Sequence, residues 1–197
     1  MQRTWREDTE VVETLSAVIL VEGVSDQVAV ETLAARRGRD LETERISVVP
    51  IGGAQAIMRA LDRFGPRGLD VGLAGLCDAA EEPDFERALE RVGLGSDLDR
   101  GGLEALGFYV CDADLEDELI RALGADAVLA VVEAHGDLGS FRTLQKQEAW
   151  RGRPVEAQLR RFMGSGARRK IRYARFLVEA LEFPHMPRPL ELVLRRV

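Results

Sequence analysis

The chain has 197 residues, enough for one domain or for a domain with a helical appendage, and 46% of them are hydrophobic, which suits a real core. A net charge of −7 gives no sign of nucleic-acid binding by the surface as a whole, and no apolar run approaches the ~20 residues of a membrane span. The two cysteines, Cys77 and Cys111, lie in apolar runs and no signal sequence is visible, so we expect a soluble cytoplasmic protein without membrane contact.

The first part of the chain alternates predicted strands and helices after a polar start over residues 1–13. The first strand is a continuous apolar run, typical of a strand buried on both faces. The strands are predicted at Ala17–Val21, Ile46–Pro50, Leu69–Cys77 and Leu106–Cys111. Helices are predicted at 26–37, 54–64, 83–92 and 114–123, with a loop rich in glycine and aspartate at 93–102. This alternation predicts an α/β fold with a four-stranded, mainly parallel sheet flanked by helices.

The pattern changes after Gly124, because no strand signal appears beyond about residue 112. Helices alone are predicted there, at 125–134, 141–150, 154–163, 167–181 and 190–196. We therefore expect an α/β domain over residues 14–123 and an all-helical C-terminal extension, residues 124–197, packed on it.

Acidic residues follow three of the four predicted strands. Glu22 ends the first, with Asp26 four residues later, Asp78 ends the third, and Asp112 ends the fourth ahead of a longer acidic stretch. Parallel strands end at one edge of the sheet, so these carboxylates should converge, and they would repel one another without a cation. This predicts a site for a hard divalent ion of the Mg²⁺ type. Taken singly, Asp26 fits a helix cap equally well, and Glu22 fits a solvated strand end.

The charge is unevenly distributed along the chain. Residues 78–118 hold 14 acidic and 3 basic side chains, whereas residues 151–175 hold 9 basic side chains and one acid. We interpret this as a cation-binding half and a phosphate-binding half, with a solvated basic helix as the alternative. The candidate nucleic-acid-binding residues are Arg160, Arg161, Arg168, Arg169 and Arg172.

The acidic motifs resemble those of the Toprim domain, the metal-dependent domain shared by topoisomerases, bacterial-type primases and certain nucleases. Val-Glu-Gly-Val-Ser-Asp at 21–26 and Asp-Leu-Glu-Asp-Glu-Leu at 114–119 are most similar to the OLD-family nucleases, over about residues 16–123. The resemblance implies a Rossmann-like Toprim fold and a Mg²⁺- or Mn²⁺-dependent endonuclease. Such an enzyme would hydrolyse, or nick, phosphodiester bonds in DNA, with RNA still open as a substrate.

The same resemblance implies roles for single residues by their positions in the motifs. Besides binding metal, Glu22 would act as the general base that takes a proton from water. Lys170, in Lys-Ile-Arg-Tyr-Ala, resembles the family's late lysine and would stabilise charge on the scissile phosphate, with Lys146 as the rival. The implied metal ligands are Glu22, Asp26, Asp78, Asp114 and Glu116.

The sequence departs from the family's pattern in two places. Ala80 stands where the second Asp of an Asp-x-Asp motif is expected, so Glu81 or Glu82 would substitute, or one metal would bind less firmly. No Gly-x-x-x-x-Gly-Lys-Ser/Thr motif is present, so we expect a stand-alone Toprim unit whose ATP dependence, if any, comes from an ATPase partner in trans.

Companion surfaces are needed to grip a duplex, which makes a homodimer a further candidate. Two other functions stay open. One is a Toprim module that binds nucleic acid or a partner with weak or no catalysis, which Ala80 favours. The other is a phosphotransfer domain, which would need a lysine on a late strand.

Overall fold

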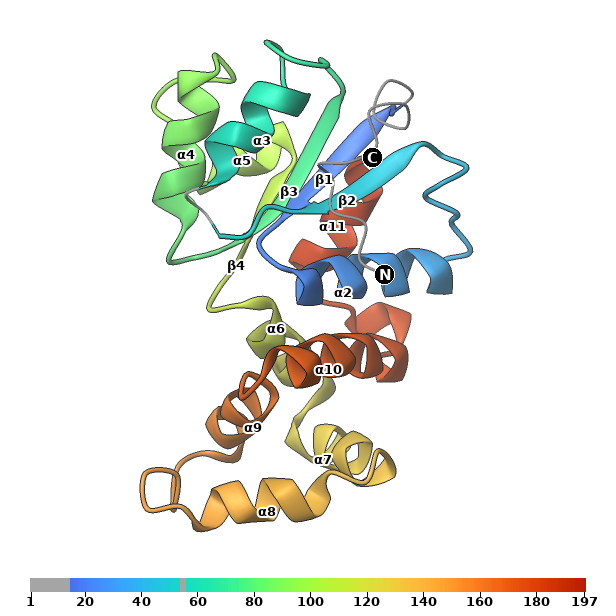
Figure 1. Cartoon of the computed structure of the whole chain (residues 1–197), viewed down its shortest axis with the longest axis vertical. Coiled ribbons are helices and arrows are strands. Elements are labelled where there is room, and N and C mark those ends of the chain that lie inside the picture. Colours follow the sequence, from blue (N-terminus) through green and yellow to red (C-terminus); the bar gives the residue numbers. More distant parts are fainter. Residues whose placement is uncertain (1–14, 54–55) are drawn as a thin grey trace.

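The protein forms one parallel sheet with helices on both faces (Figure 1). The computed structural model describes residues 15–53 and 56–197. The strands are β1 (Ala17–Val21), β2 (Ile46–Pro50), β3 (Gly72–Asp78) and β4 (Phe108–Cys111), in the order β2-β1-β3-β4. All three strand pairs are parallel, which confirms the predicted α/β class. The prediction for residues 1–13 and the start of the helix predicted at 54–64 fall outside the described residues.

Successive residues of β1 enter two different cores, because side chains alternate across a strand. Val18 and Leu20 pack toward α3 (Ile57–Phe64), α4 (Glu82–Arg91) and α5 (Arg100–Leu106). Ile19 packs on the other face, which α2 (Val24–Arg36) and the C-terminal helices cover. All five residues of β1 are buried, which explains its uninterrupted apolar run.

Helices alone follow β4 in the described part of the chain. Two of them return to the α/β part of the fold: α10 packs along helix α2, and α11 contacts β3, β4 and α2. The others extend away from it, toward the bottom of Figure 1. The helices are α6 (Leu115–Leu123), α7 (Ala125–Ala134), α8 (Leu138–Lys146), α9 (Val155–Met163), α10 (Ala167–Ala180) and α11 (Arg188–Arg196), with a short 3-10 helix at Phe183–His185. A boundary at residue 123 stays a prediction, and no described helix is long and apolar enough to cross a bilayer.

The third strand begins three residues later than predicted. Leu69 and Asp70 belong to the turn that closes α3, where the Leu69 N–H donates to the Arg63 carbonyl and the Asp70 N–H to the Gly65 carbonyl. Asp70 has a positive φ of 51°, which a strand residue does not adopt.

The last three residues of the loop predicted at 93–102 and the strand start predicted at Leu106 are wrong, because helix α5 occupies residues 100–106. Asp99 caps it by accepting a hydrogen bond from the Gly102 N–H at 2.8 Å, and Gly107 ends it with a φ of 94°. The low helix propensity of Gly101 and Gly102 conceals this helix in the sequence.

The helix predicted at 141–150 also lies earlier, at 138–146, and Trp150 is in the turn beyond it.

Candidate metal and nucleic-acid site

Glu22 and Asp26 lie where β1 passes into α2. Gly23 stands between them, and its N–H donates to Asp26 Oδ2 at 2.8 Å. That bond fixes a carboxylate at the N-terminus of α2, where the helix dipole favours negative charge. Asp26 is only 8% exposed, and this burial raises its pKa, while the bond from Gly23 and the charge of Lys170 lower it. The residue therefore closes the start of the helix and also faces the other acidic side chains.

Asp78 ends β3, the neighbour of β1, and its carboxyl lies within hydrogen-bonding reach of the Glu22 carboxyl. Two carboxyl groups can bond only if one of them carries a proton. Burial, together with the nearby charges of Glu22, Asp26 and Asp114, raises the pKa of Asp78 to about 8. The negative charge at this edge of the sheet is therefore poorly balanced around Asp78.

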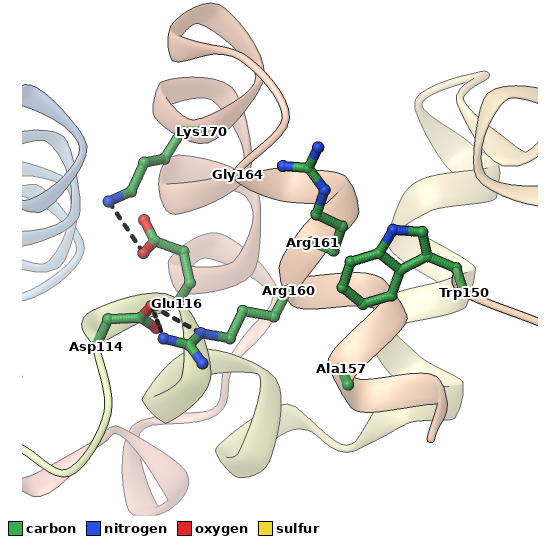
Figure 2. A pocket seen from close by; sticks show the side chains of 8 residues that line it. All are labelled: Asp114, Glu116, Trp150, Ala157, Arg160, Arg161, Gly164 and Lys170. Atoms are coloured by element: carbon green, nitrogen blue, oxygen red, sulfur yellow. Dashed lines mark hydrogen bonds and ion pairs between the residues drawn. The ribbon is translucent and has the colours of Figure 1, made fainter. Parts of the chain in front are cut away.

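Asp114 caps the first turn of α6 and contacts a cation from α9 at the same time. Its Oδ1 accepts the Asp117 N–H at 2.7 Å, and its Oδ2 accepts from Arg160 Nε at 2.7 Å. Figure 2 shows Arg160 reaching across to Asp114. This carboxylate is thus tied to both the backbone and the C-terminal helices.

Glu116 lies two residues further along, is 5% exposed, and pairs with Lys170. The distance between Lys170 Nζ and Glu116 Oε2 is 3.2 Å (Figure 2). Burial raises the pKa of Glu116 to about 7, and the charge of Lys170 opposes that rise. Lys170 also faces Asp26 and Asp114. Lys146 is exposed at the end of α8 and takes no part in this group.

All five carboxylates predicted as metal ligands, together with Lys170, therefore form one connected group. Asp112 does not join it: its side chain is 63% exposed and lies 3.3 Å from Arg100 and 3.6 Å from Arg121. Glu82, one candidate to replace the acid missing at Ala80, is ion-paired with Arg100 at 2.7 Å.

Only two of the five arginines predicted to bind nucleic acid are without a partner in the described structure. Arg160 is held by Asp114, Arg172 lies 3.2 Å from Asp137, and Arg169 lies over the Phe162 ring at 4.2 Å. Arg161 and Arg168 are exposed and make no hydrogen bond or ion pair with another described residue.

The side chains of this group are of the kind that binds divalent ions, but they are not arranged around one point. Carboxylate oxygens are the ligands that Mg²⁺ and Mn²⁺ prefer, and the unbalanced charge around Asp78 would be relieved by such an ion. As they stand, however, no three Asp, Glu, His or Cys side chains among the described residues are grouped to hold a metal. Arg160 and Lys170 already neutralise Asp114 and Glu116, so the most suitable donors are Glu22, Asp26 and Asp78.

A pocket of about 410 Å³ opens beside the ion pairs of Asp114 and Glu116. Trp150 lines it, although the sequence suggests only a packing role for this residue. A tryptophan between charged residues in a polar stretch was the available signal. The pocket is lined by Asp114, Glu116, Trp150, Ala157, Arg160, Arg161, Gly164 and Lys170.

Comparison with known proteins identifies the N-terminal part of this fold. Residues 15–78 match the family model for the Overcoming lysogenization defect protein-like (OLD-like) TOPRIM domain. The matched segment runs from before β1 to the end of β3 and includes Glu22, Asp26 and Asp78. No curated protein sequence matches the chain.

Solved structures are similar over nearly the whole chain. The C-terminal region of the OLD protein of Xanthomonas campestris pv. campestris has a TM-score of 0.74 and 23% identity, covering 95% of this chain and 94% of that one. The C-terminal region of the Burkholderia pseudomallei OLD protein has a TM-score of 0.71 and 18% identity, covering 93% and 97%. At these identities the likeness establishes the fold, helical C-terminal part included.

Proposed function

The chain carries an OLD-like TOPRIM domain, and from this premise we propose that it is a metal-dependent nuclease that hydrolyses phosphodiester bonds in DNA. The observation that supports this most is the connected group of five carboxylates and one lysine at the carboxyl edge of the sheet. Acids that are buried or half-buried side by side destabilise the folded protein, and a bound cation would relieve that cost.

Glu22, Asp26 and Asp78 would hold a Mg²⁺ or Mn²⁺ ion, with Asp114 and Glu116 as further ligands. When bound, the ion would lower the pKa of a water molecule and polarise a phosphate oxygen. Ala80 leaves this set one acid short of the family's pattern, and Glu82 is engaged by Arg100, so a second ion would depend on Glu81 and we expect one firmly held ion.

Residues of the chain would move the proton and stabilise the charge that develops on the phosphate. Glu22 would accept a proton from the water whose oxygen attacks phosphorus, the bond from phosphorus to the leaving oxygen would break, and that oxygen would take a proton from solvent water. Lys170 would face the charge that develops on the phosphate, because its ammonium is already held beside Glu116 at 3.2 Å. Arg161 and Arg168, which have no partner in the described structure, would contact the DNA backbone.

A second candidate is a module that binds nucleic acid or a partner with weak or no catalysis. The observation that favours it is the pairing of Asp114 and Glu116 with Arg160 and Lys170, which neutralises two proposed ligands. DNA is the proposed partner in both cases, with RNA as the alternative. An ATPase acting in trans and a second copy of this chain are further proposed partners.

A plasmid-nicking assay separates the two candidates. The wild type should convert supercoiled plasmid to open circles with Mn²⁺ or Mg²⁺ and not with EDTA. Glu22→Ala should lose this activity, whereas Arg142→Ala, an exposed arginine on α8 without a partner among the described residues, should keep it. Absence of metal-dependent nicking by the wild type would reject the nuclease in favour of the binding module.

A further inference from the structure

The pocket beside the carboxylate group has two chemically different sides. Asp114, Glu116 and Lys170 lie on one side, and Trp150 and Arg161 lie on the other (Figure 2). The acidic side belongs to the proposed catalytic group. Trp150 takes no part in the proposed hydrolysis, although it lies in the same pocket as that group.

Trp150 is fixed in place by hydrogen bonds through its backbone. The Trp150 carbonyl accepts from Gln158 Nε2 at 2.8 Å, and Gln158 Oε1 accepts from Gln145 Nε2 at 2.7 Å. Gln158 is one of the few buried polar residues described, at 5% exposure, and it joins the turn that carries Trp150 to α8 and α9. The indole is half-buried, so part of it packs on the core and part faces the pocket. This is a prepositioned aromatic surface, with little ordering left to do on binding.

Arg161 supplies the complementary charge. It lines the same pocket from α9, is exposed, and makes no hydrogen bond or ion pair with another described residue. The neighbouring Arg160 differs, because Asp114 holds it. An uncommitted guanidinium beside an aromatic face suits a ligand that carries a phosphate and a planar ring.

The volume of about 410 Å³ falls within the range of sites for small molecules, which suits one nucleotide rather than a duplex. A base can stack on an aromatic side chain only when it is unpaired, since in a duplex both of its faces are covered by neighbouring bases. The ligand chemistry is therefore that of an unpaired nucleotide.

We propose that this pocket is a subsite for one unpaired nucleotide next to the scissile phosphate, with the base on Trp150 and a phosphate on Arg161. The inference rests on the proposed nuclease function and narrows its preferred substrate to DNA with a single-stranded segment, which negatively supercoiled plasmid offers where it unwinds locally. The backbone of an intact duplex could contact Arg168, but none of its bases could enter this pocket.

Tryptophan fluorescence tests the proposal without any cleavage. Trp5 is the only other tryptophan of the chain, so a Trp5→Phe background makes Trp150 the sole fluorophore. In EDTA, a ten-nucleotide oligothymidylate should quench this fluorescence to saturation, and a blunt 20-base-pair duplex at the same concentration should not. Three results would overturn the proposal: equal quenching by the oligothymidylate and the duplex, equal quenching by thymidine monophosphate and the oligothymidylate, or no quenching by the oligothymidylate.

Binding of the fluorescently labelled oligonucleotide, measured by anisotropy, identifies the residues. Trp150→Ala should weaken binding at least about fivefold, the effect of losing one base stack, and Trp150→Phe should recover most of it. Arg161→Ala should weaken binding by a similar factor, and Arg142→Ala should leave it unchanged. If Trp150→Ala does not fold, judged by its circular dichroism, Arg161→Ala decides. Binding within twofold of the wild type in Arg161→Ala would reject the subsite.

The binding tests of the subsite and the nicking assay of the nuclease can fail independently. Nicking of plasmid without quenching by the oligonucleotide would keep the nuclease and reject the subsite. Quenching that depends on Arg161, without metal-dependent nicking by the wild type, would keep the subsite and reject the catalysis.

Discussion

The Lys170 ammonium lies 3.2 Å from the Glu116 carboxylate, and it is the contact through which α10 reaches the acidic group. Lys170→Ala leaves a buried carboxylate without its cation, so we expect the free energy of unfolding to fall by about 1–3 kcal/mol in urea titrations. Adding Glu116→Gln should recover most of that stability, because the group left behind is then neutral. Lys146→Ala, at an exposed position, is the matched control and should change stability little. Equal losses in Lys170→Ala and Lys146→Ala would contradict the pairing.

The raised pKa of Asp78 predicts how stability depends on pH in metal-free protein. Between about pH 4, where the carboxyl ionises in the unfolded chain, and about pH 8, where it ionises in the folded protein, the folded state binds more protons. Stability should therefore fall as the pH rises through this window, and the burial of Glu116 acts in the same direction up to about pH 7. Urea titrations in EDTA at several pH values should give a smaller slope for Asp78→Asn than for the wild type. Identical slopes would show that Asp78 ionises normally in the folded protein.

The two oxygens of Asp114 have different partners, so two substitutions should separate their contributions. Asp114→Asn keeps an oxygen for the Asp117 N–H, whereas Asp114→Ala removes the cap of α6 and should cost about 1 kcal/mol more. Both variants should lose metal-dependent nicking, because neither retains the carboxylate. Thermal unfolding and the nicking assay measure the two effects. Full activity in Asp114→Asn would remove Asp114 from the proposed ligand set.

Gly75 in β3 leaves no room for a side chain. A Cβ there would lie 2.6 Å from Cδ1 of Phe108 and 3.0 Å from the Leu20 carbonyl oxygen. Gly75→Ala should destabilise the protein by about 1–3 kcal/mol, because the sheet must open to accept it. Gly139 in α8 has nothing within 4 Å of the same position, so Gly139→Ala should stabilise by about 0.5–1 kcal/mol. A stable Gly75→Ala variant would contradict the close approach of β3 to its neighbours.

Much of the fold could be predicted because its signals are local. The run from Ala17 to Val21 is observed as β1 with the predicted bounds, and its burial on both faces follows from its composition. The proximity of Glu22 and Asp78 follows from a general rule, since adjacent parallel strands end at one edge. The short helix α5 was hidden because the capping by Asp99 outweighs the two glycines in its first turn.

The rest of the site depends on tertiary contacts that a single sequence does not encode locally. Whether Lys170 or Lys146 approaches the carboxylates is decided by the packing of α10 along α2. The outward position of Asp112 is decided by two arginines from different helices, Arg100 and Arg121. The place of Trp150 in the pocket depends on where α8 ends, which the sequence puts four residues too late.

The strand order β2-β1-β3-β4 means that the chain leaves β1 toward one side and later returns to its other side to form β3. The two connections therefore diverge at the carboxyl ends of β1 and β3, which is the topological switch point where open α/β sheets bind their ligands. Glu22 directly follows β1 and Asp78 ends β3, so the connectivity of the sheet places both acids at the switch point. Substitutions in the helices can change the side chains around this point, but the strand order that brings the two acids together is set by the whole chain.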